Sequence, residues 1–213
     1  MEKFDFNTIE NFDEHISKSI PGYDQLIEHV LNISTFFIKE DSRVYDFGCS
    51  TGNTITKLKK KHHNYGEYIG VDKAENMAKC QDFIVHQDLN QFKIKSHDFS
   101  MLLFTLQFLK LHTRYNLLNR IYNALNDQGA LIVAEKVILP TGYVQDLFTF
   151  SYYDNKLKYF NGFNILSKQY DLRSMMNPIS EEQNIQMFKE VGFITIQKFW
   201  QSLQFNAWIL LKT

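Results

Sequence analysis

The sequence predicts an α/β fold in which a mostly parallel sheet is covered by helices on both faces. Short β-prone segments alternate with segments of helical periodicity over residues 43–134. The predicted strands are apolar along their whole length, which is typical of parallel strands buried on both faces. Two further β-prone segments, 192–199 and 205–211, are close enough in sequence to pair as an antiparallel hairpin. A length of 213 residues suits one such domain better than two.

The first element that the sequence predicts is a helix over about 23–38. Apolar residues recur there at helical spacing, directly after Pro21-Gly22, a dipeptide that favours a turn. Five strands are expected to follow, because five short apolar runs lie beside turn signals: 43–47, 68–72, 83–85, 101–104 and 130–134. Together with the closing hairpin, they predict a seven-stranded sheet.

The connections between these strands are expected to be helical. Ile55 and Leu58 resume a helical period after the first strand. Thr113 is in position to cap a helix that ends in a turn at 126–129. Strand, helix and turn signals therefore agree along this part of the chain.

The last third of the chain breaks this alternation. Residues 141–180 are rich in Phe, Tyr, Asn and Lys, and we expect a mostly helical insertion over the sheet. Ser180-Glu181-Glu182-Gln183 then fits a capping box that starts another helix. The prediction is one domain over 1–213, with an amino-terminal helical cap over about 1–40 and the insertion over about 141–180.

The composition argues against several classes of protein. The 23 Lys and Arg nearly balance the 24 Asp and Glu, so no strong field favours nucleic acid or an anionic membrane. The cysteines, Cys49 and Cys80, form no CxxC motif, and no HxH or HExxH occurs, so no metal is assigned. No apolar run approaches the roughly 18 residues of a membrane span. We expect a soluble, cytoplasmic protein without direct nucleic-acid or membrane partners.

Three acidic residues at the ends of predicted strands indicate a ligand. The turn Asp46-Phe47-Gly48-Cys49-Ser50-Thr51-Gly52 follows the first strand, where glycines allow close backbone approach. Its GxxxG spacing, with an acid two residues earlier, suits a charged amino-acid group better than a pyrophosphate, and no Walker lysine follows. Asp72 can accept hydrogen bonds from both hydroxyls of a ribose, and Asp88 can contact the base. Together they outline S-adenosyl-L-methionine.

The same turn has two other interpretations, one without a ligand and one as part of a hydrolase. The glycines can simply form a tight turn without a ligand. The segment 48–52 also spells GxSxG, the nucleophile elbow of α/β-hydrolases, which need a histidine late in the chain. No histidine follows His112, so the order of residues in a hydrolase cannot be built in the usual way.

Specific strings spread over nearly the whole chain resemble one family. The strings are Phe12-Asp13, Ser19-Ile20-Pro21-Gly22-Tyr23, Val44-Tyr45-Asp46-Phe47-Gly48-Cys49-Ser50, Phe104-Thr105-Leu106-Gln107-Phe108-Leu109, Glu135-Lys136, Asn161-Gly162-Phe163 and Arg173-Ser174-Met175. They are similar to the carboxy-S-adenosyl-L-methionine synthases, a branch of the class I methyltransferase fold. The resemblance implies a Rossmann-like sheet and transfer of a carboxyl group from prephenate to the methyl group of S-adenosyl-L-methionine. In that family the product serves to modify the wobble uridine of certain transfer RNAs.

The resemblance also implies the residues of the site. The cofactor-binding residues would be Tyr23, Asp46, Gly48, Cys49, Ser50, Gly52, Asp72, Lys73, Asp88, Leu89, Leu103 and Arg173. Arg173 and Tyr23 are the catalytic candidates: the guanidinium would hold a carboxylate, which a plain methyl transfer does not require, and the phenol would add a donor.

This sequence departs from the family pattern where Lys73 and Leu103 replace asparagines. Two alternatives therefore stay open: an S-adenosyl-L-methionine-dependent methyltransferase that acts on a small carboxylate, and a non-catalytic protein that binds the same cofactor. Aromatic side chains over residues 148–160 are interpreted as a homodimer interface.

Overall fold

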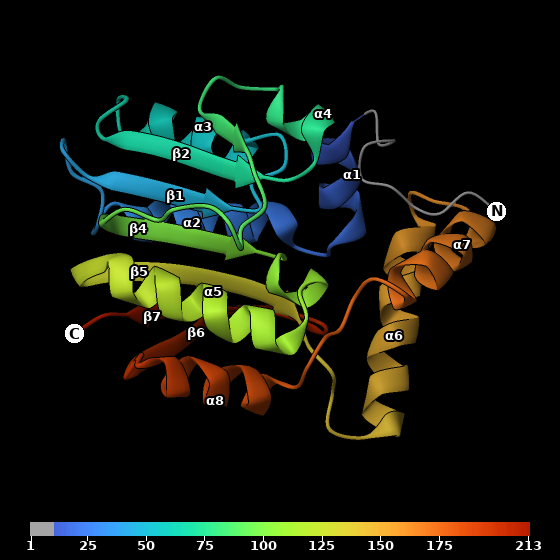
Figure 1. The fold of residues 1–213 in the computed structure, drawn as a ribbon. Helices are drawn as coiled ribbons and strands as arrows, with labels where there is room; N and C mark the ends of the chain where they lie inside the picture. Colours follow the sequence, from blue (N-terminus) through green and yellow to red (C-terminus); the bar gives the residue numbers. More distant parts are fainter. Residues whose placement is uncertain (1–10) are drawn as a thin grey trace.

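The computed structural model describes residues 11–213, except for the side chains of Met77 and Ala78. Its centre is a seven-stranded sheet in the order β3-β2-β1-β4-β5-β7-β6 (Figure 1). The strands are β1 (Arg43–Phe47), β2 (Glu67–Asp72), β3 (Ile84–His86), β4 (His97–Leu103), β5 (Leu125–Lys136), β6 (Thr195–Ser202) and β7 (Phe205–Leu211). Strands β1 to β5 pair in parallel, and β7 pairs antiparallel with both β5 and β6. The predicted fold class, with its closing hairpin, is confirmed.

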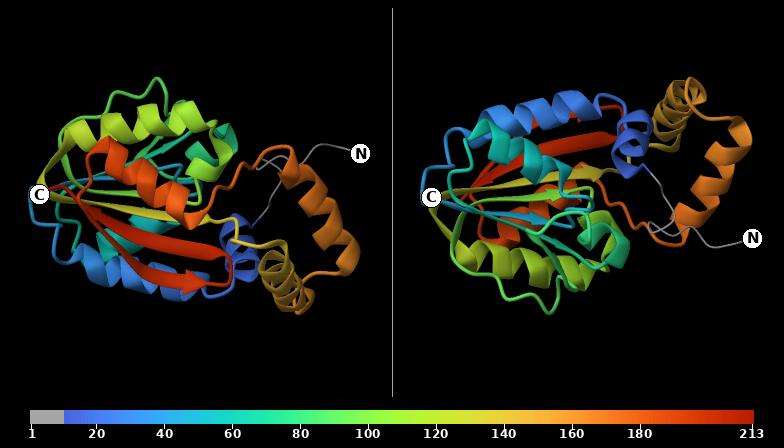
Figure 2. Two further views of the ribbon diagram at one scale, coloured as in Figure 1. Left: turned by 90° about the horizontal axis from the view of Figure 1, so that it is seen from below. Right: turned by 90° about the horizontal axis from the view of Figure 1, so that it is seen from above.

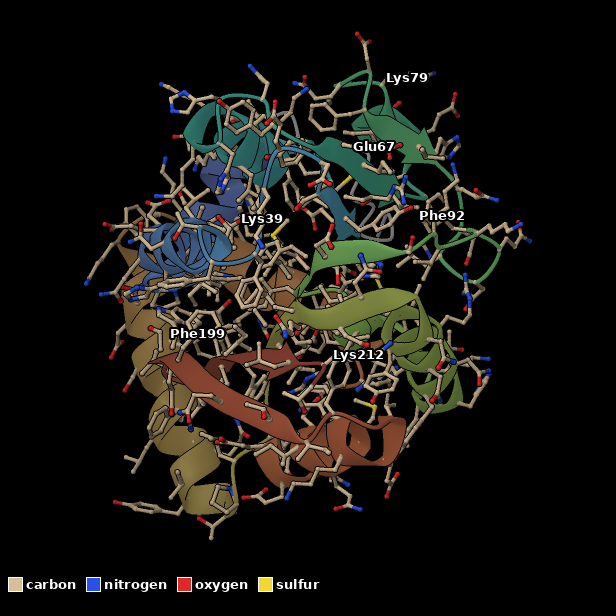
Figure 3. All side chains as sticks on the ribbon, turned by 90° about the vertical axis from the view of Figure 1, so that its left-hand side faces the viewer. Lys39, Glu67, Lys79, Phe92, Phe199 and Lys212 are labelled. Atoms are coloured by element: carbon tan, nitrogen blue, oxygen red, sulfur yellow. The ribbon has the colours of Figure 1, made fainter. Side chains whose placement is uncertain are left out.

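Helices cover both faces of this sheet, as the apolar strands predicted. On one face, α2 (Tyr23–Ser34) and α3 (Asn53–Lys61) share a core with Val44, Phe99 and Ile132. On the other, α5 (Leu111–Ala124) and α8 (Glu181–Val191) pack on Phe47 and Leu131. Figures 2 and 3 show the two helix layers with the sheet between them. Within the described residues, no helix has the length and apolar character needed to cross a bilayer.

A third group of helices lies beyond the carboxyl ends of the parallel strands. It comprises α1 (Phe12–Ser19), α6 (Gly142–Leu157) and α7 (Gly162–Arg173), which lie together at one end of the molecule in Figure 2. Helices α6 and α7 occupy the segment that was predicted as a helical insertion. The part of the predicted amino-terminal cap over residues 1–10 lies outside the described residues.

The predicted turn at 126–129 is wrong, because β5 already begins at Leu125. Gln128 donates its backbone N–H to the carbonyl oxygen of Lys212 at 2.7 Å, and Gly129 accepts from Lys212 at 3.1 Å. The Lys212 ammonium donates to the carbonyl oxygens of Tyr122 and Leu125 at 3.1 and 2.7 Å, which closes the end of α5. Long-range pairing with the chain terminus thus replaces the local turn. Helix α5 also begins earlier than predicted, with Lys110 rather than Thr113 at its cap.

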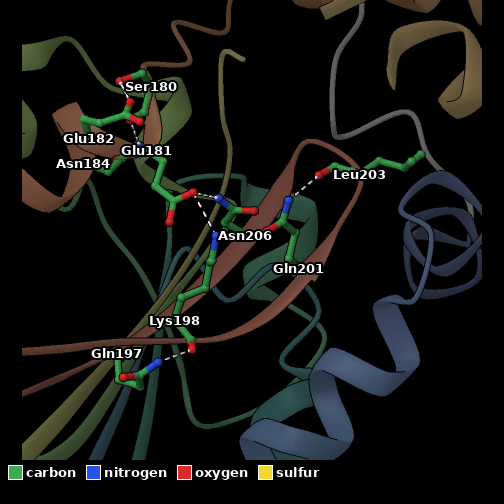
Figure 4. Close-up of polar contacts among 9 residues, drawn as sticks. All are labelled: Ser180, Glu181, Glu182, Asn184, Gln197, Lys198, Gln201, Leu203 and Asn206. Carbon is green, nitrogen blue, oxygen red and sulfur yellow. Dashed lines mark hydrogen bonds and ion pairs between the residues drawn. The ribbon is translucent and has the colours of Figure 1, made fainter. Parts of the chain in front are cut away.

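The capping box at Ser180 is confirmed, and it positions an acidic residue against the hairpin. The Ser180 hydroxyl accepts from the Gln183 N–H at 3.2 Å, and the Gln183 side chain accepts from the Ser180 N–H at 2.9 Å. Glu181, directly after Ser180, accepts hydrogen bonds from Lys198 at 2.9 Å and from the Asn206 amide at 3.0 Å (Figure 4). These contacts connect α8 to β6 and β7.

Candidate functional site

A cavity of about 290 Å³ lies at the carboxyl ends of the parallel strands, beneath α1, α6 and α7. This edge of an open α/β sheet is where ligands of such folds bind. The cavity brings together most of the residues that the sequence predicted for it: Tyr23, Gly48, Cys49, Ser50, Asp72, Lys73, Asp88, Leu89 and Leu103.

The glycine turn is shaped by close contacts that leave no room for side chains. Gly48 has φ +83°, and a Cβ on it would lie 2.4 Å from the Thr105 hydroxyl oxygen. The Gly48 N–H donates to the carbonyl oxygen of Val71 at 2.7 Å, which holds the turn against β2. Ser50 also has a positive φ of 51°. Glycine at position 48 is therefore required by the backbone path that lines the cavity.

The Asp72 carboxylate connects the end of β2 to this turn. One of its oxygens accepts from the Ser50 N–H at 2.9 Å, and the other accepts from the Ala74 N–H at 2.8 Å. Each carboxylate oxygen can accept more than one hydrogen bond, so Asp72 can still receive the hydroxyls of a ribose. Asp88 accepts from the backbone and side chain of Asn90, both at 2.8 Å. Both acids are thus fixed in orientation where they line the cavity.

Asp46, Gly52 and Arg173 do not line the cavity. Asp46 is 3% exposed, and burial, followed by the charge of Asp72, raises its pKa to about 7. Gly52 caps the start of α3 in a left-handed conformation. Arg173 is an exposed residue at the end of α7, although its neighbour Leu172 lines the cavity. The binding roles assigned to these three residues stay predictions.

Tyr23 lines the cavity from the first turn of α2. Its ring packs at a tilt on Phe104, with 6.3 Å between the ring centroids. Burial raises the pKa of its hydroxyl, so the phenol is protonated and can donate a hydrogen bond at neutral pH.

The string at 104–109 is held in place by a buried acid. Glu135 is 2% exposed, and its two oxygens accept from the N–H groups of Leu106 and Gln107, both at 2.8 Å. Burial raises the pKa of Glu135 to about 8. The Gln107 side chain in turn accepts from the Lys136 N–H at 3.0 Å. These bonds fix the 3-10 helix η2 (Leu106–Phe108) to the end of β5, beside the cavity.

Besides the predicted Lys73, three further lysines line the cavity, and sequence reasoning gave them no role. Lys136 ends β5, Lys156 lies on α6, and Lys168 lies on α7. Burial lowers the pKa of Lys136; burial and then the Lys136 charge lower that of Lys156 to about 8. Burial and then the Lys156 charge lower the pKa of Lys168 to about 7. A signal was available for Lys156, which stands four residues after Tyr152 within the aromatic stretch and is thus on the same helix face.

Lys168 also connects the insertion to the amino-terminal helices. Its ammonium contacts Nε2 of His15, a residue of α1 that lines the same cavity. Burial, and then the charges of Lys168 and Lys156, lower the pKa of His15 to about 4, so its ring is neutral and can accept this hydrogen bond. The contact joins α7 to α1 across the cavity.

No three His, Cys, Asp or Glu side chains come together as a set of metal ligands in the described part of the chain. The groups that line the cavity include acids at the ends of β2 and β3, a third acid, Asp13, on α1, the glycine turn, two tyrosines and several lysines. The acids suit an adenosine, and the cations suit a carboxylate.

Comparisons with known proteins bear on the family to which the chain belongs. Residues 45–133 match the family described as "Methyltransferase domain". The carboxy-S-adenosyl-L-methionine synthase of Staphylococcus epidermidis is 30% identical, over 96% of this chain and 94% of that protein. The protein of the same name from Campylobacter hominis is 31% identical, over 99% of this chain and 94% of that protein.

Solved structures show the fold. A SAM-dependent methyltransferase from Archaeoglobus fulgidus superimposes with a TM-score of 0.63 at 16% identity, over 94% of this chain and 99% of that one. Human N-acetylserotonin methyltransferase, solved in complex with SAM, gives a TM-score of 0.56 at 14% identity, over 88% of this chain and 55% of that one. The sheet is thus that of the class I methyltransferases.

Proposed function

Because the chain belongs to the carboxy-S-adenosyl-L-methionine synthase family, we propose that it transfers a carboxyl group from prephenate to the methyl carbon of S-adenosyl-L-methionine. The observation that carries the proposal is that one cavity holds both acids and cations. Asp72 and Asp88 line it, and Lys136, Lys156 and Lys168 bring positive charge to the same cavity. An ordinary methyl transfer has no need for cations beside a sulfonium, but transfer of a carboxylate does.

The residues present fit the cofactor. Asp72 would accept hydrogen bonds from the ribose hydroxyls, and Asp88, with Leu89 beside it, would contact the adenine. The turn at Gly48-Cys49-Ser50 would receive the methionine part through its backbone. S-adenosyl-L-methionine supplies the methyl carbon that receives the carboxyl group.

The proposed reaction balances without a cofactor beyond these substrates. Prephenate loses CO2 and hydroxide and becomes phenylpyruvate. Hydroxide takes one proton from the methyl carbon and leaves as water, and the carbon then bonds to the CO2. The protein would contribute position and charge: it would hold the carboxyl group beside the methyl carbon and exclude bulk water.

We also propose that Arg173 and Tyr23 bind the carboxylate of the product. Leu172, the residue before Arg173, lines the cavity, so a small movement at the end of α7 would bring the guanidinium to it. Tyr23 already lines the cavity and carries a protonated hydroxyl. Charge-assisted hydrogen bonds from both would retain the carboxylated product until it is released.

One experiment tests the proposed function. The purified protein is incubated with S-adenosyl-L-methionine, with and without prephenate, and the nucleoside is analysed by mass spectrometry. We expect a product heavier by the mass of CO2 only when prephenate is present. Absence of this product at saturating prephenate contradicts the proposal, and a methylated acid in the same mixture would indicate the methyltransferase alternative.

We further propose a homodimer formed through α6 and α7. Phe150, Phe163 and Tyr170 are 65%, 78% and 67% exposed on these helices, which is unusual for large apolar side chains unless a partner covers them. Light scattering after size exclusion should give twice the monomer mass for the native chain, and Phe163→Lys should shift it to the monomer mass. A native monomer at all concentrations tested would contradict this proposal.

The remaining part of the proposal places the reaction in a pathway. We propose that it takes place in the cytoplasm and that the carboxylated product serves to modify the wobble uridine of transfer RNA. The family resemblance supports this, and the near balance of charge supports a protein that does not itself bind the RNA.

A further inference from the structure

Two lysines from different parts of the fold contact one aromatic ring that lines the cavity. Lys136 ends β5, and Lys156 lies in the last turn of α6. Their ammonium nitrogens lie 5.6 and 5.2 Å from the centroid of the Tyr152 ring, and that of Lys156 lies 5.6 Å from the Phe160 ring. Sheet and insertion thus each place one cation against the same aromatic ring.

Neither lysine has a counter-ion among residues 11–213. The ion pairs among the described residues involve other lysines and an arginine, and neither of these two ammonium groups makes an ion pair with a described residue. Lys156 is only 2% exposed, so water solvates its charge poorly. Contact with an aromatic face compensates only part of the cost of burying an unpaired charge. A like charge on Lys136 adds to that cost.

We propose that Lys136 and Lys156 form one anion-binding subsite that holds the carboxylates of the acidic substrate and selects a dianion over a monoanion. The inference rests on the proposed function and assigns substrate recognition to residues to which the family resemblance gave no role. The two ammonium groups and the sulfonium would all be positively charged and would repel one another. A bound dianion compensates more of this positive charge than a monoanion does. The lysines also line the same cavity as Gly48 and Asp72. The substrate carboxylates must bind in that cavity if a carboxyl group is to reach the methyl carbon.

The test compares three substitutions of lysine by methionine, which has nearly the same shape and no charge. Lys136→Met and Lys156→Met remove the two cations in turn. Lys158→Met is the matched control, because Lys158 is an exposed residue directly after α6 whose ammonium contacts the Asn155 side chain at 3.5 Å. We expect each of the first two to raise the KM for prephenate about tenfold or more, while the Kd of S-adenosyl-L-methionine, measured by calorimetry, changes less than about threefold. Lys158→Met should change neither.

A second measurement tests the charge selectivity without the reaction. Succinate and its monoamide, succinamate, have almost the same shape and differ by one charge. Succinate should raise the Tm of the native protein more than succinamate does at equal concentration, and this difference should disappear in Lys156→Met. Lys136→Arg, which keeps the charge, should preserve part of the difference.

The outcomes separate this inference from the proposed function. If the native protein makes no carboxylated product, the proposed function fails, and the comparison of succinate with succinamate still decides whether the subsite exists. If the native protein makes product and both methionine variants keep the native KM, the subsite inference alone is wrong. An equal loss of S-adenosyl-L-methionine and prephenate binding would also overturn it, because a merely structural role predicts that result.

Discussion

Lys198 and Lys156 show two ways in which this fold accommodates a lysine. Lys198, on the hairpin, is partly exposed and lies 2.9 Å from a carboxylate oxygen of Glu181, with the Gln201 side chain also 2.9 Å away (Figure 4). Lys156 is buried, borders the cavity and forms no ion pair with a described residue. The charge of Lys198 is thus neutralised within the fold. The charge of Lys156, in our proposal, is neutralised only when a ligand binds.

The largest effect should come from giving the cavity its own counter-ion. Lys156→Glu would pair with Lys136 and imitate the contact between Lys198 and Glu181. We expect kcat/KM for prephenate to fall by about 10²-fold or more, because the new carboxylate both neutralises Lys136 and repels the substrate. Steady-state kinetics measures this, and calorimetry with S-adenosyl-L-methionine serves as the control. An unchanged kcat/KM would mean that the two lysines are no different in role from Lys198.

Arg173→Leu should have the next largest effect, on the product rather than on the substrate. We expect the Kd of carboxy-S-adenosyl-L-methionine to rise about tenfold, while that of S-adenosyl-L-methionine stays within about twofold. Competition calorimetry gives both values. If both affinities fall together, or neither changes, Arg173 does not hold the product carboxylate.

A pH profile sharpens the comparison further. The pKa of Lys156 is about 8, below that of an ordinary lysine, so its charged fraction falls as the pH rises through 8. The KM for prephenate should therefore rise about tenfold when the pH is raised from 8 to a value between 9 and 9.5. Lys156→Arg, which stays charged, should move this rise to higher pH; a profile identical to that of the native protein would assign the titration to another group.

The groups around Lys156 limit what else can produce this profile. Lys168 has a pKa of about 7 and Glu135 one of about 8, both set chiefly by burial. Burial raises the pKa of the Tyr152 hydroxyl, so this group stays protonated and neutral over the pH range of the profile. Only the part of the profile that Lys156→Arg moves belongs to Lys156.

The smallest effect should follow from disturbing the paired lysine. Glu181→Gln removes the charge that Lys198 contacts, but both side chains are partly exposed. We expect the free energy of unfolding in urea to fall by about 1 kcal/mol or less, with no change in the KM for prephenate. A change in KM as large as that of Lys156→Met would show that the two lysines do not differ in the way proposed.

The sequence predicted the adenosine end of the cavity better than its cationic part. Asp72 and the Gly48 turn are set by local strand–turn–helix order, which a sequence pattern reveals. Lys156 and Lys168 reach the cavity only because α6 and α7 pack over it. The spacing of Lys156 from Tyr152 puts the two on one helix face, but no local pattern shows that this face meets the cavity. Arg173, assigned by resemblance, is offset by one residue from Leu172, which faces the cavity. One residue turns the side-chain direction by about 100° around a helix.

The distribution of the two cations over sheet and insertion has a mechanical consequence. Glu135 and Gln107 fix the backbone around Lys136 to the body of the protein, while Lys156 is carried by α6, outside the sheet. A bound dianion that touches both ammonium groups would act as a bridge between two separately packed layers. Substrate would then strengthen the attachment of the insertion to the rest of the molecule, and the chamber in which the carboxyl group moves would be closed by the very molecule that supplies it.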